Sequence, residues 1–274
     1  MRKIYFAGDH SRLHCGCQAV VAYIKSIFKD KDFEFVKKLD DADLLVVNGE
    51  GTMHHTSSGF KKKMNLIQAA QASGKKTYLI NTVWEKNSNL YDSVLMGLDG
   101  FIVRESASQL DLVKNHGLNA DVRLDFSYFC ELKEVSKYKN LNGSKCLTDF
   151  YSSDFGGWVK YSGGAISKYP YLKMNDFSWS EFVKTLSTSS LLITGRHHAV
   201  FAACKARTPF VALESNTHKI SGFVRMSNIP IPVCDRPSQL GTATKWAEKN
   251  KNAYSDFFDF LEEQPKFILQ DIGL

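Results

Sequence analysis

Short apolar runs without alternation of polar and apolar residues recur along this sequence, and they limit its fold more than any other feature. Residues 44–48 read Leu-Leu-Val-Val-Asn, and residues 190–194 read Ser-Leu-Leu-Ile-Thr. A strand with one wet face alternates apolar and polar residues, so these runs predict strands that are buried on both faces. Segments with helical periodicity, such as residues 17–28, lie between such runs. Strands and helices in alternation predict parallel sheets covered by helices, which is the α/β class.

The alternation occurs twice along the chain. Strands and helices alternate up to about residue 127, and a polar stretch with Lys, Asn and Gly follows. We therefore predict a Rossmann-like first domain over residues 1–127, a linker over residues 128–144 and a Rossmann-like second domain over residues 145–274. The second domain ends in two predicted helices that could pack back on the first. Two doubly wound domains facing each other across a cleft are the fold that we expect.

Composition and charge narrow the classes of protein. No apolar run reaches the roughly 20 residues that a membrane helix needs. The net charge of +6 is mostly spread along the chain, unlike the clustered charge of a nucleic-acid binder. The apolar part of residues 1–8 is too short for a signal peptide, so we expect a cytoplasmic protein. Its basic surface leaves peripheral contact with the inner face of a membrane as a further option.

The cysteines and histidines do not form a recognisable metal motif. Six cysteines are scattered along the chain, and Cys15 and Cys17 have one residue between them instead of the usual two. The two adjacent histidine pairs point apart on a strand or helix, because neighbouring side chains face different directions. We therefore expect reduced thiols and no metal.

The most informative turn follows the apolar run at residues 190–194. Gly195, Arg196, His197 and His198 stand between the end of a predicted strand and the start of a helix of small residues. Open α/β sheets bind ligands at this edge, and a helix N-terminus attracts anions. One interpretation is an anionic ligand held by the planar fork of Arg196, with His198 as proton donor. The other is an Arg in a structural ion pair beside histidines that cap the helix.

A second loop of the same predicted domain could converge on this turn. The strand over residues 209–214 ends at a loop that contains Asn216, His218 and Lys219. Because parallel strands end at one edge of a sheet, we expect these residues to bind the same anionic small molecule.

In the first predicted domain, the strand over residues 44–48 runs into a glycine-containing loop. Gly49 and Gly51 flank Glu50, and Thr52 and His54 follow. Glycines allow close approach of the backbone to a ligand or a sharp turn. Glu50 could act as a base that deprotonates a hydroxyl, or it could hold the loop by hydrogen bonds.

Two further turns in this domain could face the cleft or simply contact solvent. Asp9 and His14 lie in the polar turn after the first predicted strand, and Arg104 follows the strand over residues 100–103. We include all three among the candidate residues of the cleft loops.

In several of these segments the sequence resembles the polysaccharide pyruvyl transferase family. Residues 194–199 read Thr-Gly-Arg-His-His-Ala, similar to the family signature Gly-Arg-x-His-Ala. A helix of small residues, Pro209, a strand and the segment Lys-Ile-Ser-Gly-Phe at residues 219–223 follow it. Residues 103–108 match an Arg-Glu/Asp-x-x-Ser stretch, and Asp125 matches a later Asp. Residues 48–51 stand where many members carry a run of glycines, which Glu50 interrupts here.

The resemblance implies a two-domain GT-B-like fold and transfer of a pyruvyl group from phosphoenolpyruvate to a sugar, which forms a ketal. The acceptor would be a surface glycan or its lipid-linked precursor, bound on the side of the first domain, and no cofactor would be needed. The Arg and His of the signature correspond to Arg196 and His198. Phosphoenolpyruvate carries a carboxylate and a phosphate, so Arg196 and Lys219 suit it. His198 would protonate the enol carbon, and Glu50, or a histidine near residue 54, would accept a hydroxyl proton.

Two other classes remain open. The same turns suit a GT-B glycosyltransferase that uses a nucleotide sugar, with Glu50 as the acceptor's base. A protein that binds a glycan or an anion without turnover is the other.

Overall fold

The computed structural model describes residues 1–8, 14–29 and 32–274, and it divides into two compact units. The first unit comprises the described residues within Met1–His10, Val21–Phe126 and Pro265–Leu274. The second comprises those within Ser11–Val20 and Ser127–Gln264. The chain passes from the first unit to the second between Phe126 and Ser127. Residues 128–144, which we expected to form a linker, are part of the second unit.

The last ten positions show the largest departure from the predicted domains, because they belong to the first unit. The Tyr23 hydroxyl donates to the Phe267 carbonyl at 2.8 Å, and the rings of Phe126 and Phe267 stack with centroids 4.7 Å apart. Arg123 pairs with Asp271 at 2.8 Å. The two terminal helices themselves remain in the second unit, and only the tail beyond them is anchored in the first.

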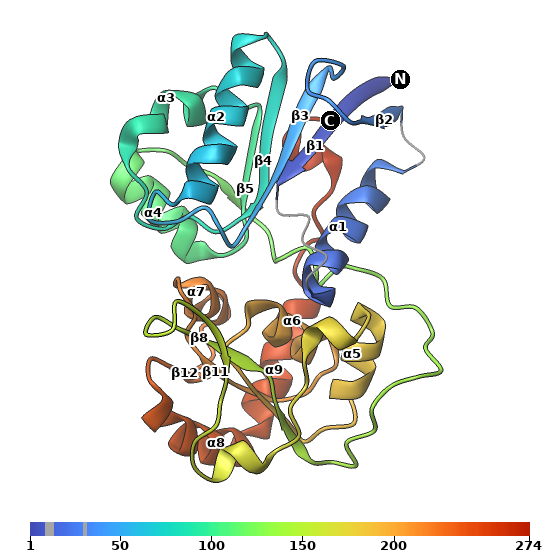
Figure 1. The fold of residues 1–274 in the computed structure, drawn as a ribbon, viewed down its shortest axis with the longest axis vertical. Coiled ribbons are helices and arrows are strands. Elements are labelled where there is room, and N and C mark those ends of the chain that lie inside the picture. The colour runs from blue at the N-terminus through green and yellow to red at the C-terminus, as the bar shows by residue number, and fades with distance from the viewer. Residues whose placement is uncertain (9–13, 30–31) are drawn as a thin grey trace. The chain divides into compact units, whose positions relative to one another are not determined.

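A six-stranded, fully parallel sheet forms the centre of the first unit (Figure 1). Its strands are β1 (Arg2–Gly8), β2 (Phe33–Val36), β3 (Leu44–Glu50), β4 (Lys76–Thr82), β5 (Gly100–Val103) and β6 (Asp121–Val122). The order β2-β1-β3-β4-β5-β6 reverses direction between β1 and β3. Every residue of β3 is buried, as its unbroken apolar run predicted. In sheets of this kind the reversal point is where ligands bind, outside the carboxyl ends of the strands.

Helices cover both faces of this sheet. They are α1 (Cys15–Phe28), α2 (Ser58–Ala72), α3 (Asp92–Met96) and α4 (Ser106–His116), with short 3-10 turns η1 (Asn89–Tyr91) and η5 (Leu269–Ile272). The start of α1, up to Val20, belongs to the second unit. Helix α2 begins at a cap in which the Ser57 hydroxyl accepts the Phe60 N–H, and α4 ends at Gly117 with φ +63°. Helix α2 packs on β3 and β4 through Phe60, Met64 and Ile67, which are fully buried.

A four-stranded parallel sheet forms the centre of the second unit, in the order β12-β11-β10-β7. Its strands are β7 (Lys145–Leu147), β10 (Leu191–Thr194), β11 (Phe210–Leu213) and β12 (Val233–Cys234). The helices are α5 (Trp179–Leu186), α6 (His197–Lys205), α7 (Lys219–Arg225), α8 (Leu240–Lys249) and α9 (Lys251–Glu262), with 3-10 turns η2 (Ala165–Lys168), η3 (Met174–Asp176) and η4 (Pro237–Gln239). Ser178 caps helix α5 in a capping box with Glu181. Both sheets are parallel, which confirms the predicted α/β, Rossmann-like class.

The second unit also contains an antiparallel hairpin. It consists of β8 (Asp149–Ser152) and β9 (Gly157–Lys160), joined by a turn at residues 153–156, and Tyr171 makes an isolated bridge to Leu147. The rings of Tyr151 and Trp158 pack across the hairpin at 5.7 Å. Cross-strand aromatic pairs of this kind stabilise a hairpin.

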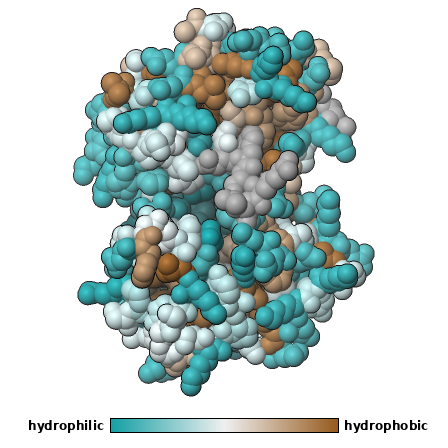
Figure 2. All heavy atoms as spheres, viewed as in Figure 1, coloured by the Kyte–Doolittle hydropathy of each residue, from teal (hydrophilic) through white to brown (hydrophobic). Residues whose placement is uncertain are grey.

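The surface agrees with the composition of the chain. The face drawn in Figure 2 is mainly hydrophilic, with hydrophobic residues in small separate groups. Among the described residues, no helix combines the length and the apolar character that crossing a membrane requires.

Candidate functional site

Three turns meet at the carboxyl edge of the parallel sheet in the second unit. Asp149 follows β7, Arg196 follows β10 and Lys219 follows β11. Strand β10 pairs with both of its neighbours, with Ile193 opposite Leu147 and Thr194 opposite Ala212. The two turns predicted from the sequence, those after β10 and β11, are therefore adjacent in the fold.

Arg196 is held on two sides. Its Nε and Nη2 donate to the two carboxylate oxygens of Asp149, both at 2.6 Å. Its guanidinium also lies over the Trp158 ring, 3.9 Å from the centroid. This is the ion pair of our second interpretation. An arriving anion would meet a guanidinium whose Nε and Nη2 already bind a carboxylate, so it must use the remaining N–H groups or displace Asp149. The sequence did not point to Asp149.

The backbone around Arg196 is fixed by close contacts. The Thr194 hydroxyl accepts the Arg196 N–H at 3.0 Å and hydrogen-bonds the Thr148 hydroxyl. A Cβ at Gly195 would lie 2.9 Å from the Cα of Phe150, so the hairpin can approach only a glycine here. The start of α6 therefore has a rigid position.

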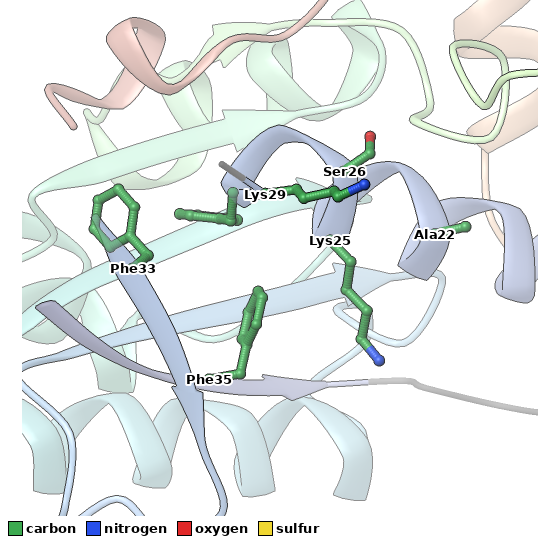
Figure 3. Close-up of a pocket in the computed structure, with 7 residues that line it drawn as sticks. Ala22, Lys25, Ser26, Lys29, Phe33 and Phe35 are labelled. Carbon is green, nitrogen blue, oxygen red and sulfur yellow. The ribbon is translucent and has the colours of Figure 1, made fainter. Parts of the chain in front are cut away.

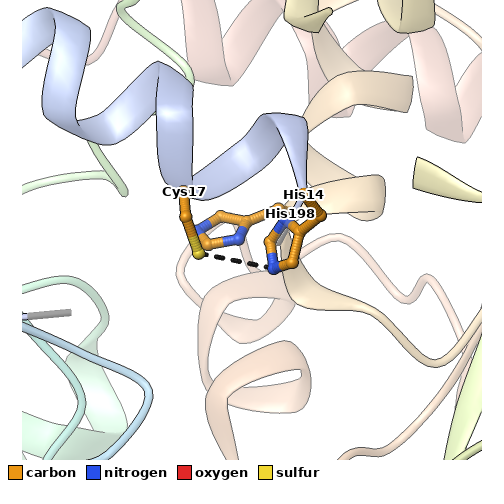
Figure 4. A group of neighbouring side chains, drawn as sticks. All are labelled: His14, Cys17 and His198. Atoms are coloured by element: carbon orange, nitrogen blue, oxygen red, sulfur yellow. Dashed lines mark hydrogen bonds between the residues drawn. The ribbon is translucent and has the colours of Figure 1, made fainter. Parts of the chain in front are cut away.

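His197 and His198 form the first turn of α6, and both are buried. The His197 ring packs against Phe201 at 4.9 Å, which places it among aromatic side chains. The His198 ring lies 5.2 Å from the ring of His14. The Sγ of Cys17 is 3.4 Å from Nε2 of His14, so two residues from the start of α1 meet one from α6 (Figure 4). All three belong to the second unit.

The loop after β11 carries the second predicted cation. The Lys219 ammonium donates to the Asn216 side-chain oxygen at 2.6 Å. His218 precedes α7 directly. The Glu214 carboxylate accepts the backbone N–H groups of Ser215 at 3.0 Å and Ser221 at 2.9 Å, and so closes the loop. Asn216, His218 and Lys219 thus follow the strand next to the Arg196 turn, as expected.

In the first unit, Glu50 is the last residue of β3 and not part of the loop that we predicted after residue 48. It is buried and has φ +42°, in a backbone region that non-glycine residues rarely adopt. Its Oε1 accepts from Asn48 at 3.0 Å, and Asn81 donates to Asn48 at 3.3 Å. Asn81, at φ +51°, accepts the Phe126 N–H at 3.1 Å. Side-chain amides therefore orient the Glu50 carboxylate beside the point where the strand order reverses.

The two glycines beside Glu50 have different surroundings. A Cβ at Gly49 would lie 2.2 Å from the Thr82 Oγ1 and 2.4 Å from its Cβ, so Gly49 permits β3 and β4 to approach. Gly51 lies in the turn after β3 and is partly exposed. Thr52 donates to the Gly49 carbonyl at 3.3 Å and accepts from Lys63 at 2.5 Å.

The remaining candidates do not gather with Glu50 into one group. His54 contacts His55, with their Nδ1 atoms 2.9 Å apart. Arg104 is buried and pairs with Asp125 at 2.9 Å, so it braces the unit interior instead of lining an open loop. Asp9 lies outside the described residues.

The first unit also has a pocket of about 620 Å³ that the sequence did not suggest. It lies where α1 ends and β2 begins, with Phe33 and Phe35 beside Lys25 and Lys29 (Figure 3). It combines aromatic side chains with two ammonium groups.

None of the six cysteines, all of which lie in the described residues, forms a disulfide. Burial raises the pKa of Cys15 to about 12 and that of Cys146 to about 12. Burial also raises the pKa of Cys234 to about 11. These three side chains are therefore protonated near neutral pH.

Comparisons with known proteins bear on the family and the fold of this chain. The model of a family described as polysaccharide pyruvyl transferase matches residues 15–217. No curated protein matches the sequence.

Several solved structures share the fold. The S. aureus MnaA–UDP co-structure aligns with a TM-score of 0.61 at 10% identity, over 94% of this chain and 91% of that one. The UDP-GlcNAc 2-epimerase of Methanocaldococcus jannaschii, in complex with UDP-GlcNAc and UDP, aligns with a TM-score of 0.56 at 10% identity, over 96% and 99%. An uncharacterized protein of Klebsiella pneumoniae aligns with a TM-score of 0.53 at 14% identity, over 82% and 89%. At such low sequence identities, these structural alignments establish the two-domain, GT-B-like fold and no more.

Proposed function

Because this chain belongs to the polysaccharide pyruvyl transferase family, an enzyme family, we propose that it transfers the pyruvyl group of phosphoenolpyruvate to two hydroxyls of a sugar. The sugar would be part of a glycan or of its lipid-linked precursor. The product is a ketal, and inorganic phosphate leaves. We expect no cofactor for this reaction, since the donor carries the activated group itself.

The observation that carries the donor half of this proposal is the shared carboxyl edge of β10 and β11. It places Arg196, the N-terminus of α6 and the Lys219–Asn216 pair on adjacent turns. A small molecule with a carboxylate and a phosphate binds to cationic side chains and backbone N–H groups, and this edge carries both. Asp149 and Trp158 hold the guanidinium plane in one orientation, which favours an acid that binds in a defined pose.

The chemistry requires three proton movements. His198 would give a proton to the methylene carbon of the donor, which leaves positive charge on the neighbouring carbon. One sugar hydroxyl then adds to that carbon and loses its proton. The second hydroxyl adds as the C–O bond to phosphate breaks, and its proton also leaves. Glu50 remains our prediction for the group that accepts a hydroxyl proton, because its carboxylate is oriented by Asn48.

The experiment is an incubation with phosphoenolpyruvate and a panel of glycan and lipid-linked acceptors. We expect release of phosphate together with an acceptor whose mass has increased by one pyruvyl ketal. Calorimetry with phosphoenolpyruvate alone tests the donor site separately. Absence of donor binding and of product with every acceptor would contradict the proposal, whereas binding without any turnover would indicate a non-catalytic anion-binding protein.

A glycosyltransferase that uses a nucleotide sugar is the second candidate. It is favoured by the UDP present in two of the structures that share this fold. A thermal-shift screen separates the two, because a ligand that binds the native state raises the melting temperature. Stabilisation by UDP or a UDP-sugar but not by phosphoenolpyruvate would favour this candidate.

A further inference from the structure

Three potential metal ligands converge in the second unit, and the function proposed above does not require a metal. They are His14 at the start of α1, Cys17 in its first turn, and His198 in the first turn of α6. One atom from each, an imidazole nitrogen or the thiol sulfur, lies within 4.8 Å of the other two. Figure 4 shows the three side chains pointing toward one another. We propose that His14, Cys17 and His198 bind a divalent, thiophilic metal ion of the zinc class.

The distances suit such an ion. With zinc–sulfur bonds of about 2.3 Å and zinc–nitrogen bonds of about 2.0 Å, tetrahedral ligand atoms stand about 3.5 Å apart. The Sγ of Cys17 and Nε2 of His14 are already 3.4 Å apart. A thiol–imidazole hydrogen bond would explain that pair, but it does not explain why a second imidazole joins it. Rotation of the His198 ring is the adjustment that would complete the set.

The backbone is shaped for this convergence. Gly16 lies between His14 and Cys17 in the sequence, and a Cβ on it would be 2.4 Å from Cβ and 2.5 Å from Cγ of His198. Any side chain at this position would therefore push His198 away from Cys17. His14 and Cys17 are three residues apart, so they share one side of the helix start. The close approach of the starts of α1 and α6 thus depends on a glycine.

The ligand types narrow the choice of ion. One thiolate and two imidazoles suit Zn²⁺ and its neighbours in the transition series, and they do not suit Mg²⁺ or Ca²⁺, which prefer oxygen. Three protein ligands leave a fourth position for water or another small group. Cys15 does not complete the set. It is two positions from Cys17, and side chains two positions apart on a helix point to different faces.

The observations behind this inference are separate from those behind the proposed pyruvyl transfer, but the two proposals share His198. A nitrogen of His198 that binds a metal cannot also donate a proton, so the two roles exclude each other at that atom. The sequence led us to expect no metal because it shows only adjacent histidine pairs. The cluster arises from residues 184 positions apart, from His14 to His198.

The test is a titration of metal-free, untagged protein with Co²⁺ and then with Zn²⁺, without donor or acceptor. We expect one Co²⁺ per chain, with the visible absorption of a tetrahedral ion and a thiolate-to-cobalt band, and displacement by one Zn²⁺. If Co²⁺ leaves the absorption spectrum of the unaltered protein unchanged, or binds without the thiolate-to-cobalt band, the proposal is overturned.

Variants test the three ligands and the glycine. Cys17→Ser, His14→Gln and His198→Gln should each weaken Zn²⁺ binding at least tenfold, and Cys17→Ser should abolish the thiolate band. Gly16→Ala removes no ligand but should also weaken binding, because it displaces His198. Cys146→Ser, a buried cysteine of β7, is the matched control and should bind as the unaltered protein does. Equal affinity in all of these proteins, each verified as folded by circular dichroism, would refute the site.

Discussion

The carboxylate of Asp149 holds the guanidinium of Arg196 through two hydrogen bonds of 2.6 Å each. These residues are 47 positions apart and follow two paired parallel strands, β7 and β10. An arginine in the family signature is thus fixed by a carboxylate that lies outside it. Both side chains are partly exposed, with 17% and 16% of their surfaces accessible, so the pair can still meet a ligand.

The first prediction concerns this pair. Arg196→Ala should weaken binding of phosphoenolpyruvate about tenfold or more, equivalent to about 1.4 kcal/mol, because the planar fork is lost. Arg196→Lys should restore little, since an ammonium cannot bind Asp149 through two parallel hydrogen bonds. Calorimetric titration with the donor measures both. Unchanged donor affinity in Arg196→Ala would remove this residue from the donor site.

Asp149→Asn is the companion change. It keeps the shape of the side chain but removes its charge, so we expect a loss of about 1–3 kcal/mol in the free energy of unfolding and a less ordered Arg196. Urea denaturation measures the first effect. Donor binding that is unaltered in this variant would show that Asp149 does not position the guanidinium for a ligand.

A second prediction separates binding from turnover at His198. If His198 supplies the proton, His198→Gln should lower kcat by about 10²–10⁴-fold with little change in the affinity for phosphoenolpyruvate. Steady-state kinetics and donor calorimetry on the same preparation decide this. His197→Gln is the neighbouring control, because His197 packs among aromatic rings and should affect stability more than kcat. A kcat equal to that of the unaltered enzyme in His198→Gln contradicts the proton-donor role.

A third prediction compares a glycine in a crowded position with a glycine in an open one. Gly49→Ala should destabilise the protein by about 1–3 kcal/mol, because its Cβ would overlap Thr82 on the paired strand. Gly241→Ala, within α8, meets nothing within 4 Å and should be neutral or stabilise by up to about 1 kcal/mol, since alanine favours a helix. Denaturant unfolding of both variants tests the contrast. Equal effects would show that the approach of β3 to β4 does not require Gly49.

A fourth prediction concerns pH and the C-terminal tail. Burial alone would raise the pKa of Asp271, but hydrogen bonds from Arg123 and from the Ile268 N–H outweigh it, so the pKa lies below its usual value. A lowered pKa in the folded state adds stability above the unfolded-state value of about 3.9, and this stability is lost as the pH falls through the folded-state pKa. Asp271→Asn should therefore lower the melting temperature at pH 7 and have much less effect near pH 2. A decrease of equal size at both pH values would contradict this origin.

Much of the fold and part of the candidate site were readable from the sequence. The apolar runs at residues 44–48 and 190–194 became β3 and β10. The signature around Arg196 and His198 pointed to the family that the comparison supports. These are local signals, because periodicity, caps and short motifs act between residues a few positions apart.

The sequence by itself thus determined the α/β class, most of the elements and the turns that carry polar side chains. Only the tertiary structure decided which side chains meet: Asp149 with Arg196, Asn81 with Asn48, and Cys17 with both His14 and His198. It also assigned the tail after Gln264 to the first unit and revealed the hairpin of β8 and β9. The physical reason is that such partners are brought together by strand order and by burial of apolar surface, which act across the whole chain and leave no mark at any one position.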